Sequence, residues 1–123
     1  MKIVVLSDNR TLSETLQPEH GLCIYLETNK YRCLLDTGAS DKFILNAEIL
    51  GVDIQAIDYV FISHGHADHI GGLPAFLAVN NKAKIVLSKN AVNQSFFSSR
   101  NSLHSISIDF DFSPYAERFI FVN

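Results

Sequence analysis

One sequence feature constrains the fold of this chain most. It is a short apolar run followed directly by a dense group of residues that commonly bind metals. Residues 59–62 are apolar, residues 64–69 carry three of the five histidines and one aspartate, and two glycines follow at 71–72. An apolar run bounded in this way is typical of a buried strand of a parallel sheet, which needs helices on its faces. The sequence therefore predicts an α/β layered fold with a ligand-rich loop at the end of one strand.

The histidine-rich segment predicts a divalent metal site. Imidazole and carboxylate are ligands that zinc, iron and manganese share. His64 and His66 can present their rings to the same side of an extended loop, and Gly65 leaves that loop free of steric limits. Asp68 and His69 follow where the chain turns toward a helix, so they can complete this site or hold a second ion. Metal-assisted hydrolysis is the reaction class that follows. The alternative is a polar surface loop that binds metal only adventitiously.

Strands and helices are expected to alternate around this segment. A helix capped by Ser40 or Asp41 should end at Gly51, and a second helix should follow the two glycines. Beyond it, an alternating pattern indicates a half-buried antiparallel strand. The expected strands cover residues 2–6, 59–62, 84–88, 104–112 and 119–123, the expected helices also include 73–79 and 89–99, and residues 7–20 are expected to be a loop.

A β-hairpin is expected between residues 22 and 36. Asn29-Lys30 is the expected two-residue turn, which places Glu27 opposite Arg32. In the same register Leu26 lies opposite Cys33 and Cys23 opposite Asp36. Strand alternation then puts the two cysteines on opposite faces of the sheet, which argues against a disulfide between them. The expected core side of this hairpin consists of Leu22, Ile24, Leu26, Cys33 and Leu35.

Asp36 is a further candidate site residue, because it lies where a strand runs into the turn Thr37-Gly38. Such a junction directs the last side chains of a strand toward the space above the sheet edge. The alternative is a structural one, in which the carboxylate accepts hydrogen bonds from the backbone amides of its own turn. The residues alone leave both interpretations open.

Charge and composition limit the partners. With 123 residues and 47% hydrophobic residues, the chain can form one small globular domain or part of a larger one. The net charge is −3 and the ten Lys and Arg residues are scattered, so we expect no nucleic-acid partner. The first apolar run is too short for a signal peptide or a membrane span, so we expect no membrane association and a cytoplasmic location.

Two motifs resemble those of the metallo-β-lactamase superfamily. His64-Gly65-His66-Ala67-Asp68-His69 is similar to its H-x-H-x-D-H signature, and Asp36-Thr37-Gly38 resembles the D-T-G turn that precedes it. The order of strands and helices up to about Leu87 is similar to the first half of the αββα sandwich of that family. The resemblance implies a single metallo-β-lactamase-like domain over residues 1–123 with only its N-terminal αβ half present, truncated on the C-terminal side. Three segments resemble the dihydropterin-synthase-like branch most, namely Asp8-Asn9, Glu19-His20-Gly21 and Gly71-Gly72-Leu73.

The resemblance also implies residue roles. His64 and His66 would bind a first ion, while Asp68 and His69 would bind a second. Asp68 is the expected catalytic residue, since its carboxylate can accept a proton of the attacking water. Asp36 would steady the ligand loop. Zinc is the expected metal, with iron or manganese as alternatives and up to two ions in a complete site.

Family members usually take further ligands from a second half, a His for the first metal, a bridging Asp and a last His, and none of these can be identified in residues 1–123. His20 and His104 are the other histidines, and we expect them to be surface or strand residues. A small-molecule substrate would be hydrolysed at an ester, thioester, lactam or phosphoester bond only in a complete site, so the isolated chain should be weakly active or inactive. An uncovered sheet should form a homo-oligomer or pair with the missing C-terminal half. The alternatives are a non-catalytic metal-binding or interaction module, and iron-dependent oxygen or sulfur chemistry on the same fold.

Overall fold

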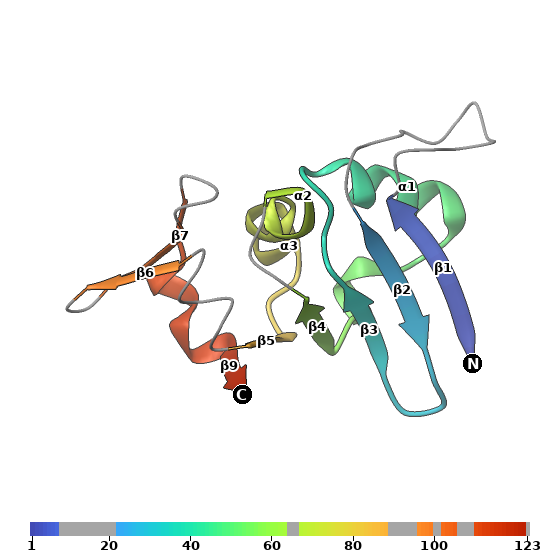
Figure 1. Ribbon diagram of the computed structural model, residues 1–123. Coiled ribbons are helices and arrows are strands. Elements are labelled where there is room, and N and C mark those ends of the chain that lie inside the picture. The colour runs from blue at the N-terminus through green and yellow to red at the C-terminus, as the bar shows by residue number, and fades with distance from the viewer. Residues whose placement is uncertain (8–21, 64–66, 89–95, 100–101, 106–109, 123) are drawn as a thin grey trace.

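The computed structural model describes residues 1–7, 22–63, 67–88, 96–99, 102–105 and 110–122 (Figure 1). One six-stranded sheet has the strand order β1-β2-β3-β4-β5-β9. The pairs β1/β2 and β2/β3 are antiparallel, and the pairs β3/β4, β4/β5 and β5/β9 are parallel. The strands are β1 Lys2–Ser7, β2 Cys23–Glu27, β3 Arg32–Leu35, β4 Tyr59–Ile62, β5 Lys84–Ser88 and β9 Phe119–Val122.

Helices connect the parallel strands of this sheet. Helix α1 follows β3, the short helices η1 and α2 flank β4, and α3 leads into β5. This alternation confirms the predicted α/β layered fold. The helices are α1 Lys42–Leu50, η1 Ile54–Ala56, α2 Ala67–Ile70, α3 Leu73–Val79 and η2 Ser113–Arg118. No helix among the described ranges is long and apolar enough to cross a membrane.

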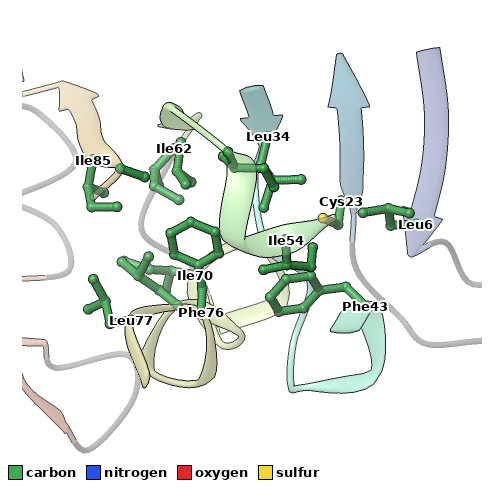
Figure 2. Packing of buried hydrophobic residues seen from close by; sticks show 14 of the residues in the cluster. Leu6, Cys23, Leu34, Phe43, Ile54, Ile62, Ile70, Phe76, Leu77 and Ile85 are labelled. Carbon is green, nitrogen blue, oxygen red and sulfur yellow. The ribbon is translucent and has the colours of Figure 1, made fainter. Parts of the chain in front are cut away.

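The core lies between one face of the sheet and helices α1 and α3. Figure 2 shows strand residues such as Leu34 and Ile85 pointing toward Phe43 and Phe76 of these helices. All four side chains are fully buried. Burial of this apolar area, at about 25 cal/mol per Å², holds the helices on the sheet.

Helix α1 has the predicted bounds, but the Asp41 side chain makes no capping hydrogen bond, and the N–H of Lys42 donates to the Ser40 hydroxyl oxygen at 3.4 Å instead. Asp41 precedes it, and Gly51 follows it in the left-handed conformation, with φ +76°. Phe43 and Ala47 are buried against the sheet, and the amide Nδ2 of Asn46 donates to the carbonyl oxygen of Leu6 at 2.8 Å. This buried bond ties α1 to β1, which lies 40 residues away in the chain.

The predicted hairpin is confirmed in its register but wrong in its core side. Glu27 pairs with Arg32, Leu26 pairs with Cys33, and the N–H of Thr28 donates to the carbonyl oxygen of Tyr31 at 2.9 Å. Cys23 and Cys33 are not joined by a disulfide. The buried side that faces the helices carries Cys23, Tyr25 and Leu34, whereas the expected set (Ile24, Leu26, Cys33, Leu35) lies on the opposite face. Both faces of this hairpin are apolar, so alternation alone could not identify the helix-covered one.

The region after β5 differs from the prediction in part. Residues 96–99, expected to be helical, form β6 Phe96–Ser99, which pairs antiparallel with β7 Ser102–Ser105. The alternating run at 104–112 contributes to β7 and to β8 Phe110–Asp111. The strand expected at 119–123 is confirmed as β9. Most of the loop expected at 7–20 lies outside the described residues.

Asn80 and Arg118 attach β9 to the rest of the domain. The amide Nδ2 of Asn80, a residue only 1% exposed, donates to the carbonyl oxygens of Ile54 and Ile57 at 2.9 and 3.1 Å. The guanidinium of Arg118 donates to the carbonyl oxygens of Asn80 and Ala83 at 2.7 and 2.9 Å. Burial lowers the pKa of Arg118 below its ordinary value. This set of bonds holds the start of β9 beside β5.

Candidate metal centre

The candidate site lies at the carboxyl ends of β3 and β4. These strands are parallel neighbours, with Leu35 paired to Phe61, so both end at the same edge of the sheet. The N–H of Asp36 donates to the carbonyl oxygen of Phe61 at 2.8 Å and continues the ladder by one bond. Asp36 and Ser63, which follow the two strands, are thereby placed side by side.

The Asp36 carboxylate joins both ends of the ligand segment. Its Oδ1 accepts a hydrogen bond from the Ser63 N–H at 2.7 Å, and its Oδ2 accepts one from the Ser63 hydroxyl at 2.6 Å. Oδ2 also lies 2.8 Å from Nδ1 of His69. Ser63 directly precedes His64, and His69 closes the motif. One buried carboxylate therefore fixes where the segment 63–69 begins and where it ends.

The backbone of Asp36 is in the left-handed region, with φ +58°. For a residue other than glycine this conformation costs about 1–2 kcal/mol, although aspartate tolerates it better than most. Strained residues of this kind persist where the surrounding structure over-determines them. The bonding partners of the carboxylate lie 27 and 33 residues along the chain, so the geometry favours the site interpretation of Asp36 over a purely local turn.

The turn after β3 and the start of α3 pack backbone against backbone. The N–H and the hydroxyl of Thr37 both donate to the carbonyl oxygen of His69, at 2.9 and 3.1 Å. The N–H of Gly72 donates to the carbonyl oxygen of Gly38 at 3.0 Å. A Cβ atom on Gly72 would lie 2.3 Å from the carbonyl oxygen of Thr37, which leaves no room for a side chain. Gly72 therefore permits the close approach that these bonds need.

The structure places the predicted ligands unevenly. His64 and His66 lie outside the described residues. The backbone of Asp68 is in helix α2, and His69 follows it with its ring against Asp36. Within the described ranges, no group of three or more His, Cys, Asp and Glu side chains is close enough to hold a metal. The assignment of the four ligands therefore stays a prediction.

Of the two other histidines, His104 belongs to the part of the chain that the structure describes. His104 is in β7, where its backbone pairs with Asp111 of β8, and His20 lies outside the described residues. Sequence reasoning missed Ser63 and the specific role of Thr37. Ser63 stands directly between the end of a strand and the first expected ligand, and this position is the signal that could have identified it.

Of the four expected ligands, the structure describes the side-chain contacts of His69 alone, and the contact at its Nδ1 is of a kind that metal-ligating histidines make. A carboxylate can only accept a hydrogen bond, so this bond requires a proton on Nδ1 of His69, and in that neutral tautomer the lone pair is on Nε2. Metal-ligating histidines almost always donate their other ring N–H to a carboxylate or carbonyl oxygen in this manner. The contact between Asp36 and His69 has this same pairing of a carboxylate with Nδ1.

Two comparisons with known proteins point to the same family. The sequence profile of the metallo-beta-lactamase superfamily matches residues 16–117. A solved metal-dependent hydrolase of the beta-lactamase superfamily aligns with 98% of this chain and 40% of its own, with a TM-score of 0.65 and 31% sequence identity.

Two relatives from Methanocaldococcus jannaschii are similar over shorter regions. The 7,8-dihydropterin-6-methyl-4-(beta-D-ribofuranosyl)-aminobenzene-5'-phosphate synthase is 31% identical over 84 residues, which cover 63% of this chain and 29% of the relative. An RNase J-like protein is 44% identical over 54 residues, which cover 44% of this chain and 12% of the relative. The chain thus spans well under half the length of these proteins. From the profile match, the motif and the fold together, the chain belongs to the metallo-beta-lactamase superfamily.

Proposed function

We propose that this chain carries the N-terminal part of a metal-dependent hydrolase site. His64 and His66 would hold one divalent ion, and Asp68 and His69 would hold a second. The observation that carries this proposal is the hydrogen-bonded set of Asp36, Ser63 and His69, because it orients one expected ligand and anchors both ends of the ligand segment. A purely structural loop does not require a histidine ring held by a buried carboxylate.

The bound metal would activate water and polarise an ester, thioester, lactam or phosphoester group of the substrate. Among the chain's own residues, Asp36 holds the proton on Nδ1 of His69, and Ser63 holds the Asp36 carboxylate in place. Asp68, directly before His69 in α2, is the proposed proton acceptor. We propose zinc as the metal, with iron or manganese as alternatives, because imidazole and carboxylate suit all three. If iron is the bound metal, iron-dependent oxygen or sulfur chemistry is the alternative to hydrolysis.

The proposed site is incomplete in residues 1–123. The chain corresponds to 40% of the solved hydrolase, and catalytic zinc sites usually have three protein ligands per ion. We therefore propose that further ligands come from polypeptide outside these residues and that the isolated chain is weakly active or inactive.

The proposed substrate is a small molecule. The net charge of −3 and the scattered cations support this choice over nucleic acid, whose binding depends on clustered Lys and Arg residues. The RNase J-like relative makes a nucleic-acid phosphodiester the competing substrate to test. A cytoplasmic location is also proposed, supported by the unbridged Cys23 and Cys33.

Metal analysis of the purified chain tests the site. After addition of Zn²⁺ or Mn²⁺ and removal of unbound ions, wild type should retain metal, and the double variant His64→Ala/His66→Ala should retain much less. His104→Ala is the matched control and should bind as wild type does. The proposal is wrong if the wild-type chain holds no metal, or if the double variant holds as much metal as wild type.

The sheet face opposite the helices supports a second candidate function, an interaction module. All six strands contribute apolar side chains to it, namely Ile3, Val5, Ile24, Leu26, Cys33, Leu35, Tyr59, Phe61, Val86, Ile120 and Val122. Lys84 and Ser88 of β5 also lie on this face. Ile3 is 60% exposed, and Phe61 and Ile120 are 40% and 41% exposed. Contiguous apolar patches of this kind mark protein contacts. We propose that a second β-sheet packs here, supplied by polypeptide that corresponds to the unmatched part of the solved hydrolase.

Solution mass tests this face. Without the second sheet, the 123-residue chain should self-associate through it, and Phe61→Lys or Ile120→Lys should reduce association in sedimentation equilibrium. Ile49→Lys is the control, because Ile49 is 49% exposed but belongs to helix α1 on the other side of the sheet. A wild-type chain that stays monomeric at high concentration would contradict the proposal.

A further inference from the structure

We infer that Thr37 is a positioning residue for His69 and that Gly72 makes this positioning sterically possible. The inference rests on the proposed function, because it assigns to Thr37 the task of holding the backbone of an expected metal ligand. Neither residue touches the proposed metal, so both would act through His69.

The first step is the double hydrogen bond to one carbonyl group. The oxygen of His69 accepts from the backbone N–H of Thr37 at 2.9 Å and from its hydroxyl at 3.1 Å. Helix α2 spans only Ala67–Ile70, so it is too short to be stable by its own intrahelical bonds. The carbonyl oxygens in the last turn of a helix lack intrahelical donors. Thr37 supplies two donors, its N–H and its hydroxyl, to one such oxygen.

The second step is that consecutive residues hold the two ends of His69. Asp36 accepts from the ring at Nδ1, and Thr37 donates to the main chain. With the peptide group and the ring both fixed, the Cα–Cβ bond and the ring plane have little freedom left. The lone pair on Nε2 is then directed before any ion binds, which lowers the entropy cost of binding.

The third step is the close approach at Gly72. A Cβ atom there would lie 2.3 Å from the carbonyl oxygen of Thr37 and 2.5 Å from that of Ser40. Both atoms belong to the backbone, so neither can rotate away as a flexible side chain would. Any side chain at position 72 would push the turn 36–38 away from the segment 69–72 and lengthen the bonds between Thr37 and His69.

Two substitutions isolate the hydroxyl of Thr37. Thr37→Val keeps the shape and the backbone bond but removes the donor, whereas Thr37→Ser keeps the donor. Loss of partners that orient a metal ligand typically costs about 10–100-fold in affinity, so Thr37→Val should weaken Co²⁺ binding by roughly 10-fold. Thr37→Ser should restore affinity close to wild type. Thr28→Val, which removes a hydroxyl at the hairpin turn, is the matched control and should bind as wild type does.

The readouts are the Co²⁺ dissociation constant, the visible d–d spectrum and ¹⁵N NMR of the His69 ring in the metal-free chain. Wild type and Thr37→Ser should show a single ring tautomer with the proton on Nδ1, and Thr37→Val should show a mixture and an altered spectrum. Unchanged affinity, spectrum and tautomer in Thr37→Val overturn the inference. Lower stability with unchanged affinity of the folded protein overturns it too, since that is a merely structural role. If wild type binds no Co²⁺, the proposed function fails, while the metal-free NMR comparison still decides the role of Thr37.

Discussion

Replacing Gly72 with alanine should destabilise the domain far more than the same change at Gly51. At position 72 the new Cβ would meet two backbone carbonyl oxygens, at 2.3 and 2.5 Å, and Cε1 of Phe43 at 2.7 Å. Overpacking of a rigid site costs about 1–3 kcal/mol, and weakening the bond from Gly72 to Gly38 adds about 1 kcal/mol. The expected loss for Gly72→Ala is therefore about 2–4 kcal/mol.

Gly51→Ala is the matched control for this prediction. Gly51 ends helix α1 with φ +76°, and a Cβ there would find nothing within 4 Å. Only the left-handed conformation is penalised, by about 1 kcal/mol.

Urea unfolding followed by far-ultraviolet circular dichroism measures both glycine variants. With a slope of roughly 2 kcal/mol per molar urea, the midpoint should fall by about 1–2 M for Gly72→Ala and by about 0.5 M for Gly51→Ala. Equal losses in the two variants would refute the claim that the turn 36–38 and the segment 69–72 pack backbone against backbone.

Three further predictions concern titratable groups. Asp36→Asn should weaken metal binding by about 10–100-fold in equilibrium dialysis, because a neutral amide holds the His69 ring less firmly than a carboxylate does. The hydrogen bond from the Arg32 N–H, and further the ammonium group of Lys82, lower the pKa of Asp58. The ionised Asp58 therefore stabilises the fold above its unfolded pKa, and this stabilisation is lost as the pH falls through its folded pKa. Acid unfolding of Asp58→Asn should therefore be less steep between about pH 5 and pH 3. Burial, and then the charge of Asp58, raises the pKa of Cys33, so iodoacetamide should alkylate it more slowly at pH 8 than a free thiol.

Each of these predictions has an outcome that contradicts it. Metal affinity unchanged in Asp36→Asn would mean that the carboxylate does not support the ligand. Identical acid-unfolding curves for wild type and Asp58→Asn would show that this group contributes nothing to the pH dependence. Alkylation of Cys33 at the rate of free cysteine would contradict its partial burial in the isolated chain.

The elements around the ligand segment could be predicted because their signals are local. The bounds of β4, α3 and β5 follow from apolar runs that end at polar residues or glycines, with Pro74 in the first turn of α3. The hairpin register follows from the two-residue turn at Asn29-Lys30. These signals depend on residues close together in the chain, so the bounds of these elements can be predicted from the sequence alone.

The interpretations that failed required knowledge of distant segments. Residues 96–99 form a strand because β7 pairs with them, and a helical pattern could not reveal that partner. The core side of the hairpin was predicted wrongly because Ile24 and Cys33 are as apolar as the residues that face the helices. Which face becomes buried depends on where α1 and α3 pack.

The sequence by itself determined the ligand-rich motif, the strand before it and the family to which both belong. Only the tertiary structure decided what Asp36 does, because its partners Ser63 and His69 are 27 and 33 residues away. It also assigned Thr37 and Gly72 to the support of His69. The physical reason is that hydrogen bonds and steric contacts depend on distance in space, and parallel pairing of β3 with β4 brings these residues to one edge of the sheet.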